Sequence, residues 1–133
     1  MDHDFKVIPI LRIFDRAKAL DFYVGFLGMT LDWEHHFDET APAFIQVSRG
    51  SLTLHLSEHH GDCCPGAAVS VAMTGLDALH AEVNGKGYRF MRPGIELQPW
   101  GFREMTVIDP SGNRLHFRES VAQGPASQDQ PAG

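Results

Sequence analysis

The feature that most constrains the fold of this chain is an internal repeat, in which one order of patterns occurs twice at an offset of about sixty residues. Leu54-His55-Leu56 in the first half corresponds to Leu115-His116-Phe117 in the second, and Leu27-Gly28-Met29 corresponds to Lys86-Gly87-Tyr88. Each half must therefore form a similar set of elements. The chain has 133 residues, which suits one domain built from two such units, because halves of this size bury too little surface to stand alone.

Each half is predicted to contain a strand, a helix and three further strands. In the first half, residues 6–13 predict a strand and Asp15 is expected to cap a helix over Arg16–Leu27, where apolar residues recur at helical spacing. Gly28 is expected to end this helix in a left-handed conformation. Three strands are predicted after this helix, at residues 29–37, 43–48 and 52–57. Arg49-Gly50 is the predicted hairpin turn between the last two.

The second half repeats this order after a loop over residues 58–66 that is rich in His, Gly and Cys. A helix is predicted over Leu76–Val83 and a turn at Asp109–Gly112. The four predicted strands are Ala67–Met73, Tyr88–Met91, Phe102–Ile108 and Asn113–Arg118. The sequence thus predicts an α+β fold of two tandem β-α-β-β-β modules. We expect one domain over residues 1–120, with modules at about 6–57 and 67–119, a linker at 58–66, and a flexible tail at 121–133 that has almost no large apolar side chains.

Charge and composition exclude several classes of function. The chain has 11 basic and 17 acidic residues, a net charge of −6, and we expect no nucleic-acid partner, because phosphate contacts dominate that affinity. No apolar run approaches the roughly 20 residues of a membrane helix, and no signal peptide is apparent, so we expect a cytoplasmic protein without a membrane partner. Cys63 and Cys64 are adjacent, which favours reduced thiols over a stapling disulfide. Their role, and that of the His59-His60 loop, is left open.

Strand alternation divides each predicted strand into two faces. One face is strongly apolar and suits packing under a helix, as with Leu52, Leu54 and Leu56. The other face is mixed, and its members are Arg12, Thr53, His55, Ser70, Glu104, Thr106 and His116. A purely structural sheet would expose this mixed face to water, whereas a curved sheet would wrap it around a ligand. Alternation by itself leaves both interpretations open.

Three stretches of the sequence resemble the glyoxalase/bleomycin-resistance/dioxygenase superfamily, whose members are also called vicinal oxygen chelate proteins. These stretches are Asp21–Met29, Gln98–Gly101 followed by Arg103-Glu104, and Asp109–Phe117. The resemblance covers about residues 6 to 119, and Gln98–Gly101 narrows it toward bleomycin-resistance proteins. It implies two modules that form a curved mixed-sheet cradle. It also implies a homodimer, in which the two chains can exchange modules.

The resemblance also bears on metal binding. In metal-dependent members the ligands lie on four strands, and the matching positions here are Ile8, His55, Ala68 and His116. Two of these residues are imidazoles and two are aliphatic, whereas a catalytic divalent ion usually needs three or more protein ligands. We therefore expect no metal and no other cofactor. The alternative is a metal-dependent lyase, thiol transferase or dioxygenase that uses His55, His116 and Glu104.

Aromatic residues favour a binding function. In bleomycin-resistance proteins the tryptophan of the stretch that Gln98–Gly101 resembles stacks on the flat heterocycles of the drug, and Trp100 matches this tryptophan. A second aromatic side chain lies on the opposite side of the drug in those proteins, and Phe37 is its best match. Trp33 is a further candidate, although packing in the core is its simpler interpretation. The acids Glu34, Asp38 and Glu104 would attract a cation. The predicted ligand-binding residues are Trp100, Phe37, His55, His116, Glu104, Arg12, Ser70 and Trp33.

The function expected from these residues is metal-independent sequestration of a flat aromatic, antibiotic-like molecule, neutral or cationic, in a cavity at the dimer interface. A third possibility is a ligand-carrier accessory protein of a natural-product pathway. It would share the same cavity and differ only in its ligand.

Overall fold

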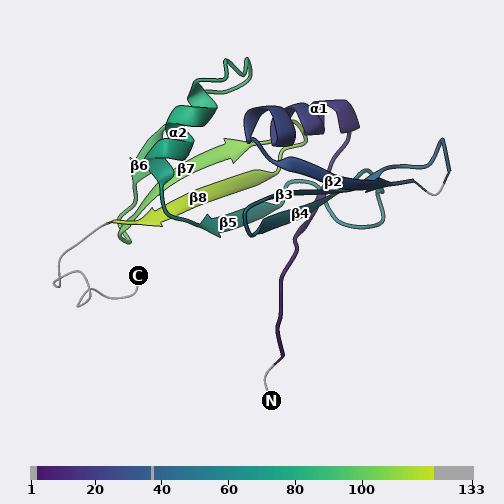
Figure 1. Cartoon of the computed structure of the whole chain (residues 1–133), viewed down its shortest axis with the longest axis horizontal. Coiled ribbons are helices and arrows are strands. Elements are labelled where there is room, and N and C mark those ends of the chain that lie inside the picture. Colours follow the sequence, from purple (N-terminus) through teal and green to yellow (C-terminus); the bar gives the residue numbers. More distant parts are fainter. Residues whose placement is uncertain (1–2, 37, 122–133) are drawn as a thin grey trace. The chain divides into compact units, whose positions relative to one another are not determined.

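The computed structural model describes residues 3–36 and 38–121 and divides the chain into two compact units (Figure 1). The first unit holds the described residues up to Ala67 together with Ile108–Arg114, and the second holds Ala68–Val107 and the described residues from Leu115 onward. Each unit contains a four-stranded sheet, with orders β1-β4-β3-β2 and β5-β8-β7-β6. The two orders are the same when counted from the start of each repeat, so the predicted α+β fold of two repeated modules is confirmed.

The elements of the first unit are β1 (Ile10–Arg12), α1 (Arg16–Leu20), η1 (Asp21–Phe26), β2 (Thr30–His35), β3 (Phe44–Arg49) and β4 (Leu52–Ser57). The pairing of β1 with β4 is parallel, and the β3–β4 and β2–β3 pairings are antiparallel. Asp15 caps α1 by accepting from the Lys18 amide, as predicted. Gly28 and Gly50 have φ of 68° and 58°, which agrees with the predicted helix end and hairpin turn.

The elements of the second unit are β5 (Ala68–Ala72), α2 (Leu76–Asn84), β6 (Ile95–Leu97), β7 (Phe102–Ile108) and β8 (Arg114–Ser120). Four of these five elements lie within two residues of the predicted bounds. The exception is β6, because the predicted strand at Tyr88–Met91 is wrong. None of the helices in the described residues has the length and apolar character needed to span a bilayer.

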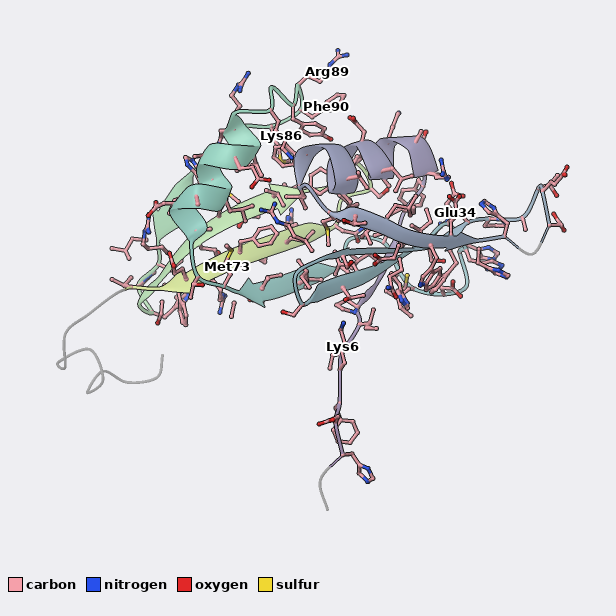
Figure 2. All side chains as sticks on the ribbon, viewed as in Figure 1. Lys6, Glu34, Met73, Lys86, Arg89 and Phe90 are labelled. Carbon is pink, nitrogen blue, oxygen red and sulfur yellow. The ribbon has the colours of Figure 1, made fainter. Side chains whose placement is uncertain are left out.

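Residues 88–91 form a loop instead of the predicted strand. The side-chain amide of Asn84 donates to the carbonyl oxygen of Pro93 at 3.1 Å, which ties the loop back to the end of α2. Figure 2 shows Arg89 and Phe90 at the tip of this loop, and Phe90 is 68% exposed. The strand forms only after Pro93, where Ile95 pairs with Met105. An apolar run without a strand beside it therefore became a loop.

The first predicted strand and helix also differ from the structure in detail. Strand β1 covers only Ile10–Arg12 of the predicted 6–13, because Pro9 has no amide hydrogen and joins the ladder only by accepting from the His55 amide at 2.9 Å. The predicted helix widens after Leu20, where the Leu27 amide bonds to the Phe22 carbonyl five residues earlier. The wide turn buries Phe22, Tyr23 and Phe26.

The predicted apolar faces of the strands form the core of each unit. They are buried in β1 and β4 of the first unit and in β7 and β8 of the second, at Leu11, Ile13, Leu54, Leu56, Met105, Val107, Leu115 and Phe117. We call the opposite side of each sheet its open face. In the first unit, Figure 2 shows Glu34 on the side of β2 that α1 covers and Lys6 on the other side of the sheet. Alternation thus identified the buried residues of these four strands, although Thr53, which it assigned to the mixed face, is also buried.

The predicted turn at Asp109–Gly112 is a buried hydrogen-bonded structure within the first unit. The Asp109 carboxylate is 3% exposed and accepts from the hydroxyl of Tyr23 at 2.6 Å and from the amides of Ser111 and Asn113 at 2.8 Å each. The Asn113 side chain donates to Asp109 at 2.9 Å and to the carbonyl of Arg12 at 2.7 Å. This motif is therefore structural, because its polar atoms are used inside the protein.

Candidate functional site

The open face of the first unit carries an aromatic cluster, formed by Trp33 of β2, Phe44 of β3 and His55 of β4. The Trp33 and Phe44 rings stack with centroids 5.9 Å apart. His55 meets Trp33 at 5.3 Å and Phe44 at 5.0 Å, edge-on in both cases. Stacked and edge-to-face rings at these distances attract one another beyond simple burial. The aromatic cluster is therefore a preformed surface on which a flat molecule can stack.

Trp33 reaches this surface because β2 contains a bulge. Leu31 pairs with Val47 and Trp33 pairs with Gln46, so Asp32 has no partner of its own in the ladder. An extra residue in one strand shifts the alternation by one position. Trp33 is 42% exposed, and the interpretation of it as a core residue is wrong. It lies on the edge strand of its sheet, where its ring contacts Phe44 and His55 on the open face.

A short hydrogen-bond chain lies beside the aromatic cluster. The Gln46 side chain donates from Nε2 to Asp32 at 3.1 Å, and its Oε1 lies 2.9 Å from Nε2 of His55. Hydrogen bonds from Ser48 and Gln46 lower the pKa of Asp32, so this carboxylate is ionised at neutral pH. Burial lowers the pKa of His55 below its usual value, so the imidazole is neutral at pH 7. The aromatic cluster is thus uncharged, with one acid at its margin.

The open face of the second unit carries a charged cluster, formed by Glu104 and Thr106 of β7 and His116 and Arg118 of β8. Arg118 donates to Glu104 at 3.1 Å, and Nδ1 of His116 lies 3.7 Å from the same carboxylate. The Thr106 hydroxyl and Nδ1 of His116 share a hydrogen bond of 2.8 Å. The guanidinium carbon of Arg118 lies 5.1 Å from the ring centroid of Phe102. This surface offers charge and hydrogen bonds rather than stacking.

Trp100 lies in the turn between β6 and β7. The Gly101 amide donates to the Gln98 carbonyl at 3.1 Å, and the Gln98 amide donates to the Phe102 carbonyl at 2.7 Å. Gly101 has a φ of 89°, a conformation that favours glycine. The turn leaves Trp100 44% exposed, as expected for an indole held by Pro99 and Gly101. Its contact with a ligand stays a prediction.

The other predicted site residues do not join these clusters. Arg12 donates through Nη1 to the carbonyls of Ile13 and Glu58, and its guanidinium carbon lies 4.8 Å from the Phe14 ring centroid. Ser70 is exposed on β5. Phe37 lies outside the described residues. The structure thus brings Trp33 together with His55, and Glu104 together with His116, while Arg12 is held by its own main chain.

Five residues in or beside these clusters were not predicted from the sequence: Phe44, Gln46, Phe102, Arg118 and Asp32. The turn between β3 and β4 is Gly50-Ser51, one residue later than the predicted Arg49-Gly50. It pairs Arg49 with Leu52 and Gln46 with His55, whereas the predicted turn would have placed Phe44 opposite His55. Arg118 could have been found from alternation, since it follows His116 by two residues on the same strand.

The acid Glu34, expected to attract a cationic ligand, is already paired inside the protein. It accepts from Nη2 of Arg16 at 2.6 Å and bonds to Nε2 of His36 at 2.6 Å. The hydrogen bond from Arg16 is the main cause that lowers the pKa of Glu34 to about 2. The bulge in β2 turns Glu34 toward α1 and leaves Asp32 beside Gln46 on the open face. Asp32 is therefore the acid of this strand that a ligand on the open face would meet.

The donor set does not fit the metal site that the resemblance would supply. Ile8 and Ala68 have no donor atom at two of the four ligand positions. Within residues 3–36 and 38–121, no three His, Cys, Asp or Glu side chains are gathered so that they could hold an ion. Three protein ligands are the usual minimum for a catalytic site. These residues therefore do not form the metal site of the metal-dependent members.

A family model and several known proteins match this chain over most of its length. The model described as "Glyoxalase superfamily protein" matches residues 3–124. The "Bleomycin resistance protein" of Geobacillus stearothermophilus is 27% identical over 132 residues, which covers 86% of this chain and 96% of that protein. A relative of the same name and identity occurs in Staphylococcus aureus.

Solved structures give the same result. A bleomycin-binding protein from Streptomyces verticillus, complexed with copper(II)-bleomycin, is 28% identical with a TM-score of 0.65, covering 92% of this chain and all of that one. A glyoxalase-related enzyme from Clostridium phytofermentans is 25% identical with a TM-score of 0.70, covering 90% and 98%. The matches thus include both a binding protein and an enzyme-related structure.

Proposed function

This chain belongs to the glyoxalase superfamily, and we propose that it binds and sequesters a flat aromatic, bleomycin-like molecule without transforming it. The names of its relatives support this, since the curated ones are bleomycin resistance proteins and one solved relative holds copper(II)-bleomycin. The resemblance first noticed in three stretches of sequence is confirmed by the family match. The ligand itself is inferred from the exposed side chains of this chain.

The observation that carries the proposal is the exposure of both tryptophans. Trp33 is 42% exposed on the aromatic cluster and Trp100 is 44% exposed in the β6–β7 turn. Large aromatic side chains are usually mostly buried, so exposed rings held by stacking partners or by a tight turn suit ligand binding. Stacking of a flat heterocycle on such a ring contributes roughly 1–3 kcal/mol and tolerates many ligands.

Charge supports a neutral or cationic ligand. The chain has a net charge of −6, and ionised Asp32 lies beside the aromatic cluster. The Glu104 carboxylate forms an ion pair with Arg118 and lies near His116, so its negative charge is largely balanced within the charged cluster. A positively charged group on the ligand would be attracted by the field of the whole chain.

Sequestration requires no metal held by the protein, which agrees with the aliphatic residues Ile8 and Ala68 at the family's ligand positions. The homodimer, a binding cavity at its interface and a cytoplasmic location remain parts of the proposal that rest on the resemblance and the sequence. The contacts of Trp100, Phe37, His116, Arg12 and Ser70 with a ligand are likewise predictions.

The test is a titration of the full chain with metal-free bleomycin and with copper(II)-bleomycin, followed by calorimetry. We expect Trp100→Ala and Trp33→Ala each to weaken binding by roughly 1–3 kcal/mol. Phe90→Ala is the matched control, because it removes an exposed aromatic outside both clusters and should leave the affinity unchanged. Mass spectrometry of the recovered drug distinguishes sequestration from catalysis. A chemically altered drug, or wild-type protein that fails to bind, would contradict the proposal.

A further inference from the structure

The orientation of the Gln46 side chain is fixed by its neighbour Asp32. An ionised carboxylate only accepts hydrogen bonds, so the group of Gln46 that lies 3.1 Å from Asp32 must be the donating Nε2. The acceptor Oε1 is thereby turned toward His55, 2.9 Å from its Nε2. Because an amide oxygen cannot donate, Nε2 of His55 must carry the hydrogen. Asp32 and Gln46 together therefore specify one tautomer of His55.

This tautomer leaves Nδ1 of His55 as a hydrogen-bond acceptor. Burial keeps the ring neutral, so it holds one proton only, on Nε2. The two ring nitrogens point to different sides, which turns Nδ1 away from Gln46. On the other neighbouring strand His55 pairs with Ile10, whose side chain cannot hydrogen bond. If Nδ1 of His55 were buried, it would be a buried nitrogen without a hydrogen-bond partner. Among the described residues only Nε of Arg118 is such an atom, so Nδ1 of His55 is exposed to solvent.

The surroundings of Nδ1 are aromatic. His55 stands edge-on to Trp33 and Phe44, with ring centroids 5.3 and 5.0 Å away. Trp33 is exposed, so a flat ligand stacked on it meets the imidazole beside it. A ligand N–H would bond to Nδ1, whereas a ligand acceptor there would place two lone pairs against each other.

We propose that Gln46 determines the ligand preference of this surface by holding His55 as an acceptor, so that the ligand is a flat aromatic molecule with an N–H group on its ring edge. The inference rests on the proposed function and names the chemistry of its ligand. Gln46 is a positioning residue, since it acts through His55. Thr106, which bonds to His116 in the second unit, has a hydroxyl that can donate or accept, and it imposes no tautomer.

The tautomer is tested on the free, full-length protein by long-range proton–nitrogen NMR of its histidines. We expect His55 to show a protonated Nε2 and an unprotonated Nδ1 at neutral pH. In Gln46→Glu, a carboxylate faces the ring and should raise the pKa of His55, so that Nδ1 becomes protonated at a higher pH than in the wild type. Ala81→Glu, on the exposed side of α2, adds the same charge elsewhere and should leave this titration unchanged.

A second variant protects the test against misfolding of the first. In Asp32→Asn the neutral amide can donate as well as accept, so Gln46 is free to turn over. We expect both tautomers of His55 to be populated in this variant, while the fold and the cluster stay as they are. A single unprotonated Nδ1 that persists in Asp32→Asn would show that Gln46 and Asp32 do not set the tautomer, and would overturn the inference.

The ligand preference is tested with norharmane, a flat three-ring aromatic with one pyrrole-type N–H, and its 9-methyl derivative, in which a methyl group replaces that hydrogen. One neutral hydrogen bond predicts that the wild type binds norharmane roughly three- to tenfold more tightly than the methyl compound. At a pH where the NMR titration shows Nδ1 protonated in Gln46→Glu but not in the wild type, this variant should lose the ratio, because a protonated Nδ1 no longer accepts. Ala81→Glu should keep it.

The possible outcomes separate the inference from the proposed function. Equal affinity of the wild type for both compounds would overturn the N–H preference while aromatic binding stands. Binding of neither compound would contradict the proposed function and the ligand preference together, whereas the NMR result for the tautomer would stand on its own. A wild-type His55 protonated on Nδ1 would overturn the inference whatever the affinities.

Discussion

His55 of β4 and His116 of β8 occupy corresponding positions of the two repeats, yet their surroundings are opposite in character. His55 lies among aromatic rings and bonds to the amide of Gln46. His116 lies near the Glu104 carboxylate and bonds to the Thr106 hydroxyl. On the neighbouring strands β3 and β7, which are offset by sixty residues, Phe44 corresponds to Glu104 and Gln46 to Thr106. A repeated backbone therefore holds two different surfaces, because residues on the open faces do not contribute to the core and are free to differ.

The turns of the two repeats differ even more than the open faces, and this predicts the largest effect. Asp109→Ala removes a buried carboxylate that accepts from Tyr23, Ser111 and Asn113. Several buried donors would lose their partner at about 1–3 kcal/mol each, so we expect a loss of roughly 4 kcal/mol in unfolding free energy. Ser51→Ala, in the exposed turn between β3 and β4, should change stability by less than about 0.5 kcal/mol. Urea unfolding of both variants measures the difference, and equal losses would contradict a structural role for the Asp109 turn.

The cores of the two units, in contrast, should respond alike. Leu54 and Leu115 are both 0% exposed at corresponding positions of the repeat. We expect Leu54→Ala and Leu115→Ala each to destabilise the protein by about 2–5 kcal/mol, through lost transfer energy and a remaining cavity. Thermal and denaturant unfolding provide the measurement. A loss confined to one of the two variants would show that the repeats are not equivalent in their packing.

The helix-to-sheet ion pairs of the two units have opposite polarity. In the first unit Arg16 at the start of α1 pairs with Glu34 of β2, and in the second Asp77 of α2 pairs with Arg103 of β7. The pKa of Glu34 is lowered to about 2, so its contribution is complete above about pH 4.5 and is lost as the pH falls toward 2. After allowance for solvent screening at the half-exposed Arg16, we expect Arg16→Ala to cost about 1 kcal/mol at neutral pH.

The pH dependence of stability distinguishes these two pairs. Stability curves between neutral pH and about pH 2 should be flatter for Arg16→Ala than for the wild type, because the variant has less of this contribution to lose. Asp77→Ala should have a smaller effect than Arg16→Ala, since Asp77 is largely exposed. An unchanged acid slope in Arg16→Ala would mean that the pair with Glu34 does not stabilise the fold.

The smallest expected effect concerns the charge preference of the two open faces. If the charged cluster contacts the ligand, Glu104→Gln should weaken binding of a cationic aromatic such as 9-aminoacridine by roughly threefold and leave a neutral one unaffected. Phe44→Leu should weaken both, because it removes a stacking partner of Trp33. Titrations at two salt concentrations separate the cases. If Glu104→Gln weakens binding of the cationic and the neutral ligand equally, Glu104 acts by maintaining the structure of the site and not by attracting the ligand's charge.

Much of the fold could be predicted from local patterns, and the failures share a cause. The strand, helix and turn at Leu52–Ser57, Leu76–Asn84 and Asp109–Gly112 follow from side-chain periodicity and turn residues, which need only a few neighbouring positions. The strand predicted at Tyr88–Met91 failed because pairing depends on a partner elsewhere in the chain, and β7 pairs with Ile95–Leu97 instead. The pattern near Tyr88 does not contain that information.

The candidate site shows the same division. Alternation correctly placed His55, Glu104 and His116 on the open faces, and the Pro99–Gly101 stretch correctly predicted an exposed Trp100. The interpretation of Trp33 as a core residue rested on the usual burial of aromatic side chains. It failed because the bulge at Asp32, which arises only when β2 is laid against β3, turns this ring to the open face. The same bulge decided which acid joins the open face, Asp32 instead of Glu34.

By itself the sequence determined the repeat, the apolar faces that form the two cores, and the absence of donor atoms at Ile8 and Ala68. Those properties are set by the identity and spacing of residues close together in the chain. Only the tertiary structure decided that Asp109 binds Tyr23, 86 residues away, and that Gln46 faces both Asp32 and His55. Hydrogen bonds between distant segments depend on strand register and on the orientation of side chains after folding, and no local pattern specifies either.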